Sequence, residues 1–129
     1  MGTGIAQVAA QAGHTVYVYD TNDAALEQSR HKLESTFARL VEKGKFTADS
    51  AKEILYRVSF EDNLRKFQGF GLAIEAIVER LDAKRSVFGT LEEIVSQDAI
   101  LATNTSSLSV AAISAKLKHP ERLVGIHFF

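Results

Sequence analysis

Residues 103–107 read Thr-Asn-Thr-Ser-Ser and follow directly on the apolar stretch 99–102. In an open parallel sheet, the apolar part of a strand lies in the core and its carboxyl end faces the crevice where ligands bind. Hydroxyl and amide side chains crowded there could bind a small molecule, because a hydroxyl both donates and accepts hydrogen bonds. A Ser/Thr-rich turn that caps the next helix explains the same pattern equally well.

His127 is a second candidate, and it lies within the apolar run 123–129. An imidazole can accept a proton near neutral pH and return it, which is the chemistry of a general base. A lone histidine in an apolar strand is more often a hydrogen-bonded core residue. The residue type alone therefore leaves both interpretations open.

The composition excludes several classes of function. The chain has 129 residues, 46% of them hydrophobic, which indicates one globular domain. Its net charge of -1 gives no reason to expect a nucleic-acid or membrane partner. It has no cysteine, and its four histidines lack metal-ligand spacing, so we expect no metal site. With no apolar run long enough to span a bilayer and no signal peptide, we expect a cytoplasmic protein, or a mitochondrial matrix protein in a eukaryote.

The first twenty residues resemble the second half of a dinucleotide-binding βαβ unit. Residues 1–13 predict a helix that ends at Gly13 and buries one face, formed by Ile5, Val8, Ala9 and Ala12. Residues 14–20 predict a strand that ends on Asp20, where such units place an acid that binds the ribose hydroxyls. A helix N-cap is the alternative role for this aspartate.

The rest of the chain alternates between helical and strand patterns. Helices are expected at about 23–43, 47–55, 82–96 and 109–116, and strands at 57–60, 72–78, 99–103 and 123–128. This alternation predicts an α/β fold with a doubly wound, mainly parallel sheet of the Rossmann type. No repeat or linker divides the chain, so we expect a single domain over residues 1–129.

Five segments spread along the chain resemble the NAD-binding domain of the L-3-hydroxyacyl-CoA dehydrogenases, including the short-chain 3-hydroxybutyryl-CoA enzymes. The segments are residues 1–6, 18–20, 74–79, 102–108 and 120–129. A glycine motif alone would be weak evidence. The combination of Asn-Thr-Ser-Ser-Leu with Gly-x-His-Phe-Phe about twenty residues later is specific.

This resemblance implies reversible, NAD-dependent oxidation of L-3-hydroxyacyl-CoA to 3-oxoacyl-CoA. His127 matches the general base, and Ser106 matches the serine between nicotinamide and substrate oxygen. Asn104 is expected to orient its neighbours at the strand end. Alternatives are a non-catalytic nucleotide-binding or structural relative, and a sugar-acid dehydrogenase that shares the domain.

The resemblance also implies two sets of binding residues. The NAD-binding set is Gly2, Asp20, Glu79, Lys84 and Ser106. Thr36 and Lys43 match positions that approach the CoA part of an acyl-CoA thioester substrate. An ordinary surface ion pair would explain Glu79 and Lys84, and a solvated helix face would explain Thr36 and Lys43.

The family's domain also has parts that these residues do not match. It begins with a strand and two further glycines, so that Gly2 matches the third. It continues past the histidine to a glutamate that orients it and to a helical C-terminal domain that forms a homodimer. We therefore expect residues 1–129 to be a truncated domain that lacks the first strand and the helical domain, and to be inactive alone.

Overall fold

The structure is a computed structural model that describes residues 2–128. It divides into two compact units, Met1–Asn63 and Leu64–Phe129, here called the N-terminal unit and the C-terminal unit. Each unit contains its own small parallel sheet. The expectation of one truncated domain over residues 1–129 stays a prediction.

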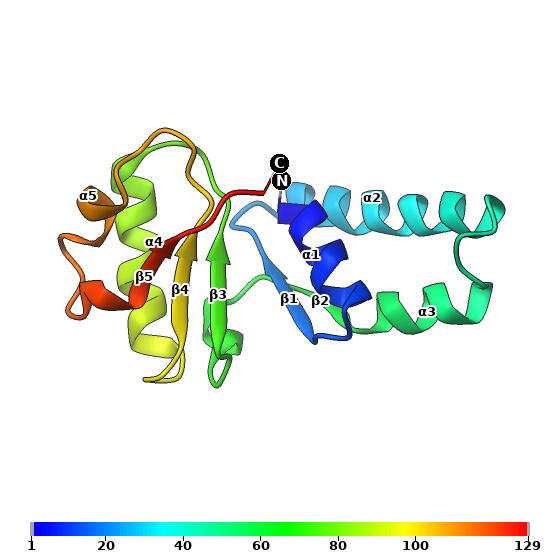
Figure 1. Cartoon of the computed structure of the whole chain (residues 1–129), viewed down its shortest axis with the longest axis horizontal. Helices are drawn as coiled ribbons and strands as arrows, with labels where there is room; N and C mark the ends of the chain where they lie inside the picture. The colour runs from blue at the N-terminus through cyan, green and yellow to red at the C-terminus, as the bar shows by residue number, and fades with distance from the viewer. Residues whose placement is uncertain (1, 129) are drawn as a thin grey trace. The chain divides into compact units, whose positions relative to one another are not determined.

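The N-terminal unit is built on two parallel strands and three helices (Figure 1). Its elements are α1 Gly2–Gln11, β1 Val16–Tyr19, α2 Asp23–Glu42, α3 Ala48–Tyr56 and β2 Val58–Glu61. The strand β1 pairs with β2 in register from Val16 opposite Val58 to Tyr19 opposite Glu61. The helices α2 and α3 together form the crossover that parallel strands require.

Polar caps and glycines fix where these helices begin and end. The side chain of Asn22 accepts a hydrogen bond from the Ala25 amide at 3.1 Å and caps α2. Thr47 caps α3 in the same way, through the Ser50 amide. Gly13 has a φ of 96°, a backbone conformation that favours glycine, and it follows α1 as the sequence predicted.

The predicted buried face of α1 is wrong in part. Ile5 is buried, but Val8 is 57% exposed, and Ala6 and Ala10 are the other buried residues of this helix. Gly, Ala and Thr make up six of the ten residues of α1, so its faces differ little in hydrophobicity and periodicity is a weak guide. The close approach of Ala10 to α2 and α3 decides the orientation instead.

The C-terminal unit has the strand order β3-β4-β5, with every pair parallel. Its elements are the 3-10 helix η1 Leu64–Phe67, β3 Leu72–Glu75, α4 Leu81–Ile94, β4 Ile100–Thr103, α5 Val110–Ser114, the 3-10 helix η2 Pro120–Arg122 and β5 Leu123–Gly125. The strands β3 and β5 end earlier than predicted, at Glu75 and Gly125. Residues 76–79 and 126–128 therefore continue as loops beyond the carboxyl edge of the sheet.

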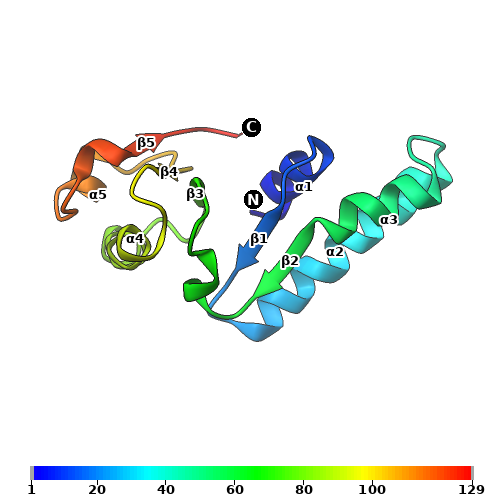
Figure 2. The same cartoon turned by 90° about the horizontal axis from the view of Figure 1, so that it is seen from below.

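One hydrophobic core holds the C-terminal unit together. The helix α4 lies along one side of the three strands (Figure 2), and α5 contributes to the same core. Its buried residues are Ala73, Phe88, Leu91, Val95, Ala99, Leu101, Ile113, Leu117 and Leu123. This core fixes the carboxyl ends of β3, β4 and β5 relative to the start of α4.

These features confirm the predicted α/β class with parallel, Rossmann-like pairing. Among residues 2–128, no helix combines the length and the apolar character needed to cross a membrane.

Replacing Phe88 by alanine tests the core of the C-terminal unit. Phe88 is 0% exposed, so Phe88→Ala should lower the free energy of unfolding by about 3–5 kcal/mol through lost burial and a residual cavity. Denaturant unfolding of the full-length protein, followed by circular dichroism, measures this change. Val78→Ala is the control, because Val78 is exposed in the same unit and its loss should cost less than about 0.5 kcal/mol. Equal losses in the two variants would contradict this description of the core.

Candidate functional site

A buried carboxylate lies at the carboxyl end of β3. Glu75 is only 4% exposed, and both of its carboxylate oxygens accept hydrogen bonds. Oε1 accepts from the Thr103 hydroxyl at 2.7 Å, and Oε2 accepts from the Ile77 amide at 2.8 Å and from Lys84 Nζ at 2.5 Å. The ends of β3 and β4 and the first turn of α4 thus meet at one side chain.

Lys84 is the counter-ion of this buried carboxylate, and its side chain is 1% exposed. Its Nζ donates to Glu75, lies 2.9 Å from Oε1 of Glu79 and donates to the carbonyl of Ile77 at 3.4 Å. An ammonium group has three donors, so these contacts account for all of them. Lys84 therefore joins a buried carboxylate to one nearer the surface.

Glu79 connects this ion pair to the loop after β4. Its Oε2 accepts from the Thr105 hydroxyl at 2.8 Å, and from the hydroxyl and the amide of Ser107 at 2.6 and 3.2 Å. The hydrogen bond from Ser107, followed by those from Lys84 and Thr105, lowers the pKa of the Glu79 carboxyl from 4.5 to about 2. We call Glu75, Glu79, Lys84, Thr103, Thr105 and Ser107 the carboxylate network.

The predicted catalytic residues lie on the segments that leave β4 and β5. Ser106 is exposed and stands between two members of the carboxylate network, while His127 is exposed two residues after β5. Asn104 joins the two segments. Its side-chain Oδ1 accepts from the backbone amide of Phe128 at 2.9 Å, and its backbone amide donates to the carbonyl of Glu75 at 2.9 Å. Asn104 therefore links the end of β4 to the segment after β5, and its role as a strand-end orienting group stays a prediction.

Gly125 allows β5 to pass close to α5 just before His127. A Cβ at this position would lie 3.0 Å from Cγ2 of Val110, which is tighter than ordinary van der Waals contact. The absence of a side chain therefore lets the strand and the helix approach each other at this point.

The other predicted residues belong to the N-terminal unit. Asp20 follows β1, and its Oδ1 accepts from the Asn22 amide at 2.9 Å, which fixes the carboxylate at the strand end. Gly2 begins α1, and a Cβ there would meet nothing within 4 Å in the described residues. Thr36 donates to the carbonyl of Lys32 at 2.8 Å, and Lys43 is an exposed residue at the end of α2.

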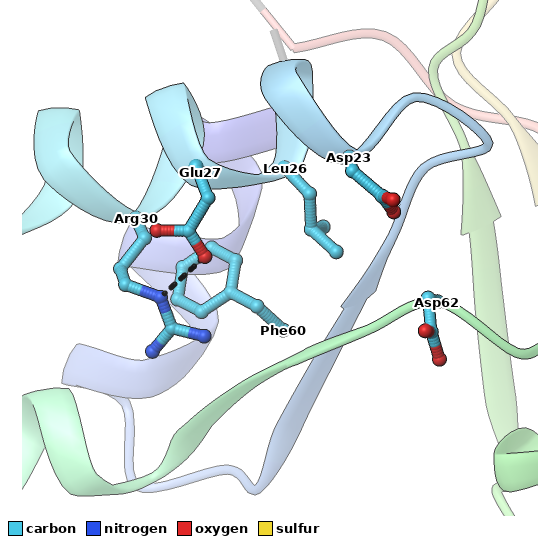
Figure 3. A pocket seen from close by; sticks show the side chains of 6 residues that line it. All are labelled: Asp23, Leu26, Glu27, Arg30, Phe60 and Asp62. Carbon is cyan, nitrogen blue, oxygen red and sulfur yellow. Dashed lines mark hydrogen bonds and ion pairs between the residues drawn. The ribbon is translucent and has the colours of Figure 1, made fainter.

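A pocket of about 300 Å³ also lies in the N-terminal unit (Figure 3). Its lining residues are Asp23, Leu26, Glu27, Arg30, Phe60 and Asp62, none of which the sequence predicted as a site residue. The Arg30 guanidinium lies 4.7 Å from the centroid of the Phe60 ring and 3.4 Å from Glu27. The cation in this pocket is therefore already engaged by protein groups.

The structure thus brings Glu79, Lys84, Ser106 and His127 into the C-terminal unit. Glu75 is the main residue of the site that the sequence analysis missed, since it was included only within the expected strand 72–78 and was given no role. An acid inside a buried apolar strand is itself a signal, because a carboxylate is rarely buried without a partner. Among residues 2–128, no group of acids and histidines is arranged to hold a metal ion.

Comparison with known proteins identifies the family. The model of the 3-hydroxyacyl-CoA dehydrogenase NAD binding domain matches residues 1–129. The chain belongs to this family. The match also confirms the predicted cofactor class, because the matching domain is the one that binds NAD.

Individual relatives agree with this assignment. The chain is 42% identical to the probable 3-hydroxybutyryl-CoA dehydrogenase of Bacillus subtilis, covering 99% of this chain and 45% of that protein. The crystal structure of 3-hydroxybutyryl-CoA dehydrogenase from Escherichia coli K12 gives a TM-score of 0.95 at 40% identity, over 100% of this chain and 27% of that one. The (S)-3-hydroxybutyryl-CoA dehydrogenase of Ralstonia eutropha gives 0.94 at 32% identity, over 100% and 46%. The chain therefore spans less than half the length of these relatives.

The hydrogen bonds to Glu79 predict a pH dependence. A folded-state pKa near 2 means that this carboxylate stabilises the fold above about pH 4.5, and that the contribution is lost as the pH falls toward about 2. Ser107→Ala removes the largest cause and should move the pKa upward, toward 4.5. Carbon-detected NMR titration of the full-length protein measures it, and the pKa of Glu93, which Lys118 lowers, should not change. A wild-type Glu79 that titrates near 4.5 would contradict the geometry.

Proposed function

We propose that the protein oxidises L-3-hydroxyacyl-CoA thioesters to 3-oxoacyl-CoA, reversibly and with NAD, using His127 as the general base. The observation that carries this proposal is the hydrogen bond from the Phe128 amide to Asn104 Oδ1. It ties the segment that bears His127 to the strand end that bears Ser106. The family match and the names of the relatives support the same reaction.

The residues of the C-terminal unit fit the proton transfer that this reaction needs. NAD, when bound, supplies the hydride acceptor for C3 of the substrate. An imidazole nitrogen of His127 takes the proton of the C3 hydroxyl as the carbon–oxygen bond becomes a carbonyl, and returns it in the reverse direction. Ser106 donates a hydrogen bond to that oxygen, which orients the substrate and stabilises the charge that develops on it.

The structure offers groups of the right chemistry for NAD. Asp20 ends β1 with one carboxylate oxygen held by a backbone amide, and within the described residues Oδ2 makes no hydrogen bond and can accept from ribose hydroxyls. Gly2 opens α1, the helix whose start would hold the pyrophosphate. We assign Glu79 and Ser106 to the nicotinamide side of the cofactor. Lys84, predicted from the resemblance to bind there as well, has a side chain that is only 1% exposed, so we place its contribution behind Glu79.

The same proposal covers the substrate and the assembly. Thr36 lies on α2, and Lys43 follows seven residues later as the C-cap of that helix, and an ammonium and a hydroxyl suit the phosphates of CoA. The family resemblance further supports a homodimer located in the cytoplasm.

Replacing His127 tests the general base. His127→Gln in the full-length protein should lower kcat by about 10²-fold or more, because glutamine cannot accept the proton, while NADH affinity changes little. Ser106→Ala should cost less, since water partly replaces a hydroxyl that only positions the reactants. Steady-state reduction of acetoacetyl-CoA with NADH measures both. His119→Gln, a change at an exposed histidine of the same unit, is the control. Unchanged turnover in His127→Gln would contradict the proposed role.

The position of Asp20 predicts a preference for NAD over NADP. Its carboxylate would repel a 2′-phosphate, and the next two residues, Thr21 and Asn22, offer no arginine to accommodate one. Fluorescence titration of the full-length protein with NADH and NADPH should show tighter binding of NADH. Asp20→Asn should narrow the difference, while Asp23→Asn, on the exposed first turn of α2, should leave it intact. Tighter binding of NADPH by the wild type would contradict this assignment.

A further inference from the structure

The buried ion pair has no part in the proton transfer proposed above. Glu75 and Lys84 are almost completely enclosed, and burying a charge is unfavourable unless partners compensate for it. In the described residues, no buried side-chain nitrogen or oxygen lacks a hydrogen-bond partner. Both buried charges therefore have hydrogen-bond partners. Because burying two charges is unfavourable in free energy, the pair points to a function in placing other groups.

The contacts of Lys84 argue against direct binding of a ligand. Its side chain is almost inaccessible, and its three donors are directed at Glu75, Glu79 and the Ile77 carbonyl. A ligand could contact this ammonium only by displacing one of these protein groups. Lys84 therefore acts on the site through Glu79.

Glu79 binds the residues on either side of Ser106 and so limits the positions that Ser106 can adopt. One carboxylate oxygen of Glu79 accepts hydrogen bonds from Thr105 and from Ser107, the residues on either side of Ser106. The Thr105 hydroxyl also accepts from the Leu108 amide at 3.0 Å. The two neighbours of Ser106 are thus bound to a single side chain, Thr105 through its hydroxyl and Ser107 through its hydroxyl and its backbone amide.

We propose that Glu75 and Lys84 are positioning residues, which hold Glu79 in place and through it fix the loop that carries Ser106. Glu75 anchors the Lys84 ammonium in the core, between the ends of β3 and β4. Lys84 directs Oε1 of Glu79, which leaves Oε2 to bind the loop. The effect of this link on turnover rests on the function proposed above, whereas its effect on the loop does not.

Hydrogen exchange tests the link without any assay of activity. Glu75→Gln replaces one carboxylate oxygen by an NH₂ group, which donates hydrogen bonds instead of accepting them. The variant therefore loses either the bond from Thr103 or the bonds from Lys84 and the Ile77 amide. In the full-length protein, exchange of the Ser107 and Leu108 amides should accelerate by about tenfold, because their acceptors on Glu79 and Thr105 lose their fixed positions. Glu93→Gln breaks an exposed ion pair with Lys118 in the same unit and should leave these amides unchanged.

A second variant keeps the test decisive if Glu75→Gln does not fold. Glu75→Gln combined with Lys84→Met removes the buried ammonium together with its counter-ion, and such paired replacements often preserve folding. The same amides should exchange faster by about tenfold in this variant, because Glu79 has lost Lys84. Unchanged exchange at Ser107 and Leu108 in a folded variant would overturn the proposal.

A double-mutant cycle tests whether the link acts through Ser106. Glu75→Gln should lower kcat by about tenfold in the wild type, but by less than about twofold when Ser106 is already alanine. Equal losses in both backgrounds would overturn the positioning role. A wild-type protein without dehydrogenase activity would contradict the proposed function alone, and the exchange measurement would still decide whether the link exists.

Discussion

The ion pair between Glu75 and Lys84 is the interaction on which the C-terminal unit depends at its functional edge. Removing one partner of such a pair typically costs about 3–5 kcal/mol, because the other charge stays buried. The burial of Glu75 is compensated by three donors, which are a strand hydroxyl, a backbone amide and the ammonium. Parallel strands make this arrangement possible, since they bring the ends of β3 and β4 to the same edge.

Much of the fold was predictable because its causes are local. Asn22 and Thr47 cap helices through bonds to amides three residues ahead, and Gly13 follows a helix with a positive φ, all within reach of sequence patterns. The strand ends were not predictable to the residue. The apolar runs after Glu75 and Gly125 continue, but the pairing stops, because pairing depends on a neighbouring strand rather than on composition.

The places of the candidate site residues in the fold were predictable, and most of their connections were not. The polar run after β4 marked Asn104 and Ser106 correctly as residues of the carboxyl edge, and the family resemblance supplied Glu79 and Lys84. Lys84 is enclosed and joins Glu79 to Glu75 because of the way α4 packs over the strands. The bonds of Thr103, Thr105 and Ser107 to the two glutamates join residues 26 to 28 positions apart, and such distant contacts leave no local pattern in the sequence.

The bond between Asn104 and the backbone at position 128 has a consequence for how sequences of this domain can vary. The donor is a main-chain amide, which every residue except proline possesses, so position 128 can change its side chain without losing the bond. The acceptor is a side-chain oxygen at a fixed reach, which only a residue of the length and polarity of asparagine provides. This hydrogen bond therefore restricts which residues can replace asparagine at position 104, but excludes only proline at position 128.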